Sequence, residues 1–167
     1  MAGKAAPTFD ELVARMATIH AKLRRRRLTV AAAESCTGGL LGAILTAHGG
    51  SSDYFRGGAI VYSNEAKQIL ADVAPQLIHS HGAVSSVVAG ALARGARSRL
   101  AAKIGLGITG ISGPGGATPG KPVGLTYVAV DSERHSAVKK HQWTFDRSGN
   151  RLASVGAALD LLEDAID

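Results

Sequence analysis

The sequence has little cysteine, few aromatic residues and no long apolar run. Its one cysteine, Cys36, cannot form an internal disulfide, so we expect a reducing, cytoplasmic compartment. No apolar run approaches the roughly 20 residues that cross a bilayer. Residues 1–7 also lack the apolar stretch of a secretory signal. We therefore expect neither a disulfide scaffold nor a membrane partner.

Positive charge is in excess, with a formal net charge of +6 and four consecutive arginines, Arg24 to Arg27. Such a run can bind nucleic acid, or it can mark a helix C-terminus, where the helix dipole favours cations. Because no aromatic residues interleave with the run for base stacking, we favour the helix terminus and do not expect nucleic acid as a partner. A positive surface would also attract small phosphorylated substrates.

Apolar residues make up 46% of the 167 residues. Along the chain, segments with the apolar spacing of helices alternate with short apolar segments typical of strands. The pattern predicts one domain over 1–167, with 1–7 disordered. It should form a three-layer α/β/α sandwich around a mixed, mainly parallel sheet with a C-terminal antiparallel hairpin. We expect helices at 9–25, from 40, from 64, from 86 and at 152–166, and strands at 28–33, 57–62, 104–110, 123–130 and 137–145.

The first candidate site is the turn Glu34-Ser35-Cys36-Thr37-Gly38-Gly39, between a strand and a helix. Ser35 would stand at a helix N-terminus, where free backbone N–H groups can stabilise an oxyanion or hold a phosphate. Gly38 and Gly39 leave room for a ligand. Alternatively, Ser35 or Thr37 simply caps the helix, which on this turn alone is the better reading.

A nucleophilic serine needs a base, and histidine is the usual one. None of the six histidines has a catalytic spacing. His79 and His81, expected in a loop, lack a third metal ligand, so we expect no metal site. Lys67 follows the second strand and would reach the same sheet edge as Ser35 if the first two strands are near neighbours. To act as a base, it would also need burial or neighbouring cations to depress its pKa. Otherwise Lys67 is an ordinary solvated helix residue.

Two more segments could bind a ligand. The run from Thr109 and Gly110 to Gly116 ends a strand and enters a proline- and glycine-rich loop over 111–122, which can form a backbone nest for an anion or a surface turn. The glycines at 105, 107 and 110 fit a dinucleotide motif, but they lie inside the strand, so we reject that match. Arg147 and Arg151 could bind a phosphate, or could pair with Asp146 or Asp160.

These segments, in this order, resemble the signature blocks of the CinA C-terminal domain family. The blocks are Ala33–Gly39, Tyr62–Lys67, His81–Ser85, Thr109–Pro114, Lys121–Gly124 and Asp146–Arg151, and the match covers 8–166. The chain departs from the family pattern at Phe145, where glycine is usual. That change puts the local backbone in doubt and leaves open which arginine binds phosphate.

The resemblance implies an amidohydrolase that converts nicotinamide mononucleotide to nicotinate mononucleotide and ammonia without a cofactor. It implies Ser35 as nucleophile, Lys67 as base and Tyr62 as a supporting catalytic residue. Thr37, Gly38, Gly39, Thr109, Gly110, Arg147 and Arg151 would bind the substrate. A homodimer is expected. The alternatives are a silent nucleotide-binding module, a competence- or DNA-associated protein and, with less weight, Cys36 as the nucleophile. The activities of the N-terminal domain of longer relatives are not carried over.

Overall fold

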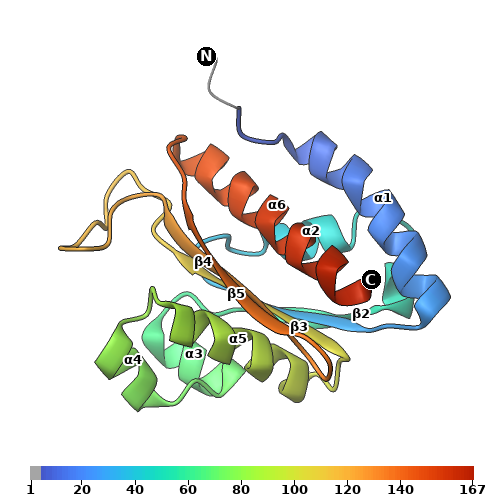
Figure 1. The fold of residues 1–167 in the computed structure, drawn as a ribbon, viewed down its shortest axis with the longest axis horizontal. Helices are drawn as coiled ribbons and strands as arrows, with labels where there is room; N and C mark the ends of the chain where they lie inside the picture. The colour runs from blue at the N-terminus through green and yellow to red at the C-terminus, as the bar shows by residue number, and fades with distance from the viewer. Residues whose placement is uncertain (1–4) are drawn as a thin grey trace.

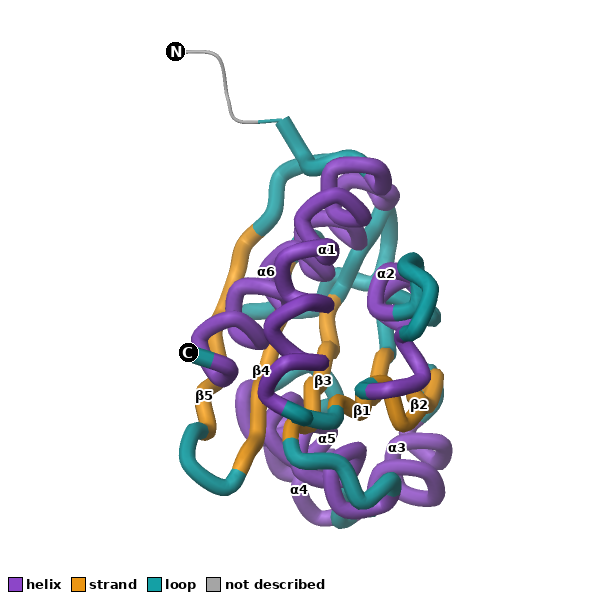
Figure 2. Tube along the Cα trace, turned by 90° about the vertical axis from the view of Figure 1, so that its right-hand side faces the viewer, coloured by secondary structure: helices purple, strands orange, loops and turns teal. Residues whose placement is uncertain are grey.

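The computed structural model describes residues 5–167, which form a five-stranded sheet in the order β2-β1-β3-β4-β5 (Figures 1 and 2). β1 pairs in parallel with β2 and β3, whereas β4 is antiparallel to both β3 and β5. Four strands therefore run one way and β4 runs against them, which confirms the mixed, mainly parallel sheet and its C-terminal hairpin. The strands are β1 (Val30–Glu34), β2 (Phe55–Ile60), β3 (Ile104–Gly110), β4 (Leu125–Ser132) and β5 (Ser136–Gln142).

Helices cover both faces of this sheet, so the predicted three-layer sandwich is also confirmed (Figure 1). One face carries α1 (Phe9–Arg26), α2 (Leu40–Leu45) and α6 (Arg147–Ile166), and their apolar side chains form the larger core. The other face carries α3 (Asn64–Ala71), α4 (Pro75–His81) and α5 (Ser86–Arg99), over a smaller core. A short 3-10 helix, Ser51–Asp53, precedes β2.

Helix α1 shows how local sequence sets an element. Thr8 and Glu11 form a capping box, and the buried side chains recur at helical spacing. At the other end, Arg24 pairs with Asp53 at 2.7 Å, and Arg27 closes the helix in the left-handed conformation. The arginine run therefore lies at a helix C-terminus, as the dipole argument favoured.

The glycines of β3 set the distance between the sheet and α5. A Cβ at Gly105 would lie 1.9 Å from the Ala93 carbonyl oxygen, and one at Gly107 would lie 2.4 Å from that of Ala89. Larger residues would push α5 away from the sheet. Close backbone packing thus accounts for the glycine spacing that also fits a dinucleotide motif.

Three expectations need correction. The segment that carries His79 and His81 is helix α4, not a loop, because Pro75 starts a helix there. Helix α6 begins at Arg147, five residues earlier than expected, because Asp146 caps it by accepting from the Gly149 amide at 2.7 Å. The expected disorder at 1–7 does not hold at Pro7, which lies against α6 beside Gly156, whereas residues 1–4 lie outside the described chain.

Within residues 5–167, no helix is long and apolar enough to cross a membrane.

Candidate active site

A cleft of about 420 Å³ opens at the carboxyl ends of β1 and β3, where the chain turns into helices and loops. Open α/β sheets bind ligands at this edge, because backbone donors and loop side chains gather where parallel strands end. The walls come from the turn after β1, the β2–α3 turn, the α4–α5 turn, the loop after β3 and the start of α6. Its lining residues are Ser35, Cys36, Tyr62, Asn64, Lys67, Ala83, Val84, Thr109–Gly113, Gly115, Gly116 and Arg147.

Ser35 and Lys67 meet in this cleft, as their places after neighbouring strands predicted. Lys67 Nζ lies 3.2 Å from Ser35 Oγ, within hydrogen-bond distance. The backbone of Ser35 is held against β3, because the Ser35 amide donates to the Ile108 carbonyl. Lys67 sits in the first turn of α3, a helix fixed by its Ser63 cap. Each group is thus held by backbone structure before any ligand binds.

The ammonium form of Lys67 is disfavoured. The residue is only 2% exposed, and burial lowers the pKa of its amine below the ordinary lysine value. Among residues 5–167 it has no carboxylate within ion-pair distance; besides Ser35, its neighbours are the carbonyls of Val61 at 2.9 Å and of Tyr62 and Ser63 at 3.4 Å each. A neutral amine can donate two hydrogens to carbonyls and direct its lone pair at the Ser35 hydroxyl.

Glu34 organises the turn that carries Ser35, a role that the sequence analysis missed. Its buried carboxylate accepts from Thr37 Oγ1 at 2.6 Å and from the amides of Gly39, Leu41 and Gly42 at 2.8–3.1 Å. The amides at the start of α2 are therefore occupied and cannot bind an oxyanion, contrary to expectation. An acidic residue just before a helix is favoured by the helix dipole, and that signal could have revealed the role.

Other donors remain near Ser35. The amides of Cys36 and Thr37 donate to no backbone carbonyl among residues 5–167. The amide that follows a nucleophile commonly contributes to an oxyanion hole. Neither Ser35 nor Thr37 caps α2, because Gly39 occupies the N-cap and Glu34 supplies the acceptor. The capping alternative is therefore wrong.

The loop after β3 forms the opposite wall. Thr109, 1% exposed, donates its hydroxyl to the Ala83 carbonyl at 2.8 Å and so ties β3 to the α4–α5 turn. Buried Asn150 of α6 donates to the Ser112 carbonyl at 3.0 Å and accepts from the amide of Phe145. These contacts hold the loop against α6. The Phe145 backbone is hydrogen-bonded to Asn150 of α6, and phenylalanine at this position does not disturb the start of the helix at Arg147.

The two arginines of α6 lie in different places. Arg147 reaches the cleft, where it donates to the Gly113 carbonyl at 2.6 Å and to the Tyr62 hydroxyl at 3.2 Å. Arg151 instead donates to the Thr37 carbonyl at 2.8 Å, behind the turn. Neither forms an ion pair with Asp146 or Asp160 in the described chain; Asp160 pairs with Arg15.

Not every predicted ligand contact lies on the cleft wall. Thr109, Gly110 and Arg147 do, but Thr37, Gly38, Gly39 and Arg151 do not. The Thr37 hydroxyl is bound to Glu34, and its side chain is fully buried. Tyr62 stands at the mouth, 60% exposed, with its phenol beside Arg147 rather than beside Lys67. Asn64, which the sequence analysis did not single out, also lines the cleft.

Cys36 is a poor candidate for the nucleophile. Its thiol is buried, and burial raises its pKa to about 11, so little thiolate exists near neutral pH. Residues 5–167 hold no group of three histidine, cysteine, aspartate or glutamate side chains arranged to bind a metal ion. The polar groups of this cleft include the Ser35 hydroxyl, the buried Lys67 amine, the Tyr62 phenol, the Asn64 amide and the Arg147 guanidinium.

The fold and the cleft define a class: a three-layer α/β protein with a serine–lysine pair at the carboxyl edge of a mixed sheet. A family model, the CinA C-terminal domain, matches residues 13–166. The chain belongs to this family.

Relatives and solved structures agree with this placement. CinA-like proteins from Acidobacterium capsulatum and Gemmatimonas aurantiaca are 52% and 46% identical over 140 and 156 residues, which are 84% and 93% of this chain. These residues are 34% and 36% of the relatives, so the chain spans about a third of their length.

The crystal structure of the competence/damage inducible protein CihA from Agrobacterium tumefaciens is similar over 98% of both chains, with 35% identity and a TM-score of 0.87. A CinA superfamily protein from Escherichia coli matches with 28% identity and a TM-score of 0.86, over 95% of this chain and 90% of that one.

Proposed function

We propose that this protein is an amidohydrolase that releases ammonia from the carboxamide of nicotinamide mononucleotide, with Ser35 as nucleophile and Lys67 as its base. The observation that carries this proposal is the buried Lys67 amine, which lies 3.2 Å from the Ser35 hydroxyl and has no carboxylate partner among residues 5–167. A lysine kept neutral at its operating pH can remove the hydroxyl proton. Membership of the CinA C-terminal domain family supports the same chemistry.

The proposed reaction has two steps. Ser35 Oγ attacks the carboxamide carbon while its proton moves to Lys67 Nζ, and the carbonyl oxygen gains negative charge. Lys67 then gives that proton to the departing nitrogen, which leaves as ammonia, and an ester to Ser35 remains. Water attacks the ester with Lys67 again as base, which yields the carboxylate and restores the serine.

The oxyanion would be stabilised by the amides of Cys36 and Thr37, which donate to no backbone carbonyl among residues 5–167. One such donor contributes on the order of 3 kcal/mol to transition-state stabilisation in other hydrolases. Arg147 would hold the phosphate, because a guanidinium binds phosphate oxygens in pairs and only this arginine of α6 lines the cleft. Tyr62 would position Arg147 through its phenol.

The experiment is ammonia release from nicotinamide mononucleotide by purified protein. Ser35→Ala and Lys67→Met should lose turnover by at least about a hundredfold, the usual scale for a missing base. The matched variants Ser98→Ala, on the exposed surface of α5, and Lys140→Met, on β5, should keep it. Methionine preserves the volume at position 67, and circular dichroism checks that each variant folds.

Arg147→Ala should raise KM more than it lowers kcat, whereas Arg151→Ala should disturb the Ser35 turn. Full activity of Ser35→Ala or Lys67→Met would refute the assignment. Substrate binding without any ammonia would identify the silent binding module instead. Salt-sensitive DNA binding that depends on Arg24 to Arg27 would identify the nucleic-acid alternative.

A cytoplasmic location stays part of the proposal, since Cys36 beside the nucleophile is a free thiol.

We also propose that two copies associate through β2. Its outer edge pairs with no other strand among residues 5–167, and exposed apolar side chains lie beside it: Ile60, Ile69 and Leu70 are 53%, 67% and 46% exposed. The opposite edge, β5, carries Lys139 and Lys140, which discourage pairing. Light scattering should give a mass of twice the 17.1 kDa chain mass, and Ile69→Glu should reduce this measured mass. A monomer at every concentration would refute this association.

A further inference from the structure

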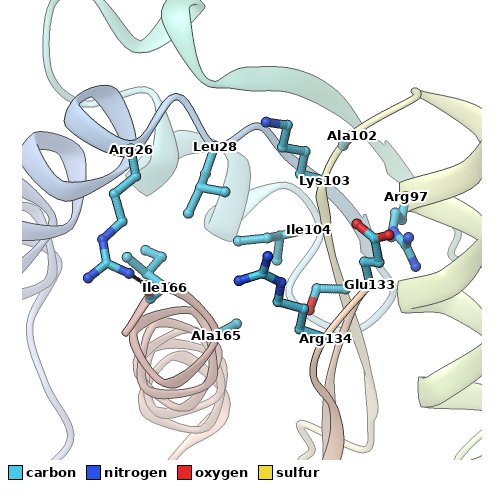
Figure 3. Close-up of a pocket in the computed structure, with 11 residues that line it drawn as sticks. Arg26, Leu28, Arg97, Ala102, Lys103, Ile104, Glu133, Arg134, Ala165 and Ile166 are labelled. Atoms are coloured by element: carbon cyan, nitrogen blue, oxygen red, sulfur yellow. Dashed lines mark hydrogen bonds between the residues drawn. The ribbon is translucent and has the colours of Figure 1, made fainter.

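A second hollow, of about 460 Å³, lies at the opposite end of the sheet from Ser35, where β1 and β3 begin and β4 turns into β5 (Figure 3). β3 contributes Ile104 to this hollow and Gly110 to the cleft, so about 20 Å separate the two at the usual rise per strand residue. We call it the basic pocket. Its lining residues are Arg26, Leu28, Arg97, Ala102, Lys103, Ile104, Ser132–Arg134, Ala165 and Ile166.

Four cationic side chains line the basic pocket against one acidic side chain, Glu133. The fold accounts for two of the cations. Arg97 pairs with buried Asp131 at 2.9 Å, and Arg26 donates to the Ile166 carbonyl at the end of α6. These contacts neutralise a buried carboxylate and a helix C-terminus.

The other two cations, Lys103 and Arg134, have no such explanation. Both lie in loops rather than at helix termini, and neither side chain has an ion pair or hydrogen-bond acceptor among residues 5–167. Figure 3 shows the Arg134 guanidinium directed into the hollow, across from Arg26. Two unpartnered cations at one concavity create a local positive potential that attracts anions.

The floor of the basic pocket is apolar. Leu28, Ile104 and Ala165 lie between the charged side chains, and Leu28 and Ala165 are partly exposed (Figure 3). A cationic rim over an apolar floor fits an organic anion better than a bare inorganic ion, because the floor gains from covering carbon. The volume is within the usual range for small-molecule sites. A guanidinium matches phosphate geometry with two parallel hydrogen bonds.

We infer that the basic pocket binds a small organic phosphate. Its phosphoryl group lies on Arg134, its apolar part lies over Leu28, Ile104 and Ala165, and Lys103 adds positive charge at the rim. This site is separate from the Ser35 cleft, and the inference does not depend on the amidase proposal.

The test is a titration of the ¹⁵N-labelled whole chain with phenyl phosphate, followed by NMR. Amide shifts should appear at residues 103–104 and 133–134. Phenol lacks the charge and inorganic phosphate lacks the ring, so each should bind more weakly. The double variant Lys103→Ala/Arg134→Ala should weaken binding about tenfold or more, equivalent to about 1.4 kcal/mol.

The matched control is Arg94→Ala/Lys140→Ala, which removes the same two residue types from exposed positions outside the pocket. It should stay within about twofold of the parent chain, as expected for remote, screened charges. Arg147→Ala should leave these shifts intact, because it alters only the cleft. Equal weakening in both double variants, phenol binding as tightly as phenyl phosphate, or shifts confined to the cleft would each overturn the inference.

Discussion

Replacing Glu34 by glutamine should destabilise the protein strongly, because one buried carboxylate satisfies four donors at the turn before α2. Oε2 accepts from Thr37 Oγ1 and the amides of Gly39 and Leu41, and Oε1 accepts from the Gly42 amide. Glutamine keeps one oxygen. If that oxygen serves the three donors, its NH₂ group faces the Gly42 amide, and donor then opposes donor.

The magnitude follows from this geometry. Three hydrogen bonds lose their charge assistance, at about 1 kcal/mol each, and the fourth is lost with an unsatisfied donor, at about 1–3 kcal/mol. The sum is a loss of about 4–6 kcal/mol in the free energy of unfolding. In a chain of this length, 1 kcal/mol corresponds to about 2–4 °C in Tm. We therefore expect Tm to fall by roughly 10–20 °C.

The assay is urea unfolding followed by circular dichroism, together with thermal melting. Glu11→Gln is the matched control, since Glu11 also caps a helix start, but its contact to Thr8 is exposed. Because water can replace that contact, Glu11→Gln should lower the free energy of unfolding much less than Glu34→Gln does. Equal losses for Glu34→Gln and Glu11→Gln would show that the buried network contributes nothing beyond an ordinary cap.

Three further predictions concern the cleft and the sheet. Because burial lowers the pKa of Lys67, kcat/KM should rise with pH through an apparent pKa below the ordinary lysine value. A rise in kcat/KM with an apparent pKa at or above that value would contradict a buried base. In that pH range the unfolded chain binds more protons, so the free energy of unfolding should also rise with pH up to the ordinary value. Gly107→Ala should cost about 1–3 kcal/mol or more of stability, since its Cβ would lie 2.4 Å from the Ala89 carbonyl oxygen; an unchanged urea midpoint would contradict that packing. Cys36, with its pKa raised to about 11, should react slowly with iodoacetamide at pH 7.5 until the protein unfolds, and rapid labelling of the native protein would contradict its burial.

The local sequence determined most elements of this protein. The Thr8 capping box, the helical spacing after it and the apolar strand before Ser35 act within a few residues, so they can be read directly from the chain. The order of helices and strands along the chain then predicted a three-layer sandwich. It also brought Ser35 and Lys67 to one sheet edge, because the carboxyl ends of neighbouring parallel strands lie together.

Only the tertiary structure decided how each polar group is used. Arg147 rather than Arg151 enters the cleft, and there it donates to the Gly113 carbonyl and the Tyr62 hydroxyl. These outcomes depend on side-chain direction and on partners up to 114 residues away, as for Arg151 and Thr37. The basic pocket likewise unites residues from four separate segments. Local patterns carry no information about such distant partners, whereas periodicity and capping arise within one or two turns of chain.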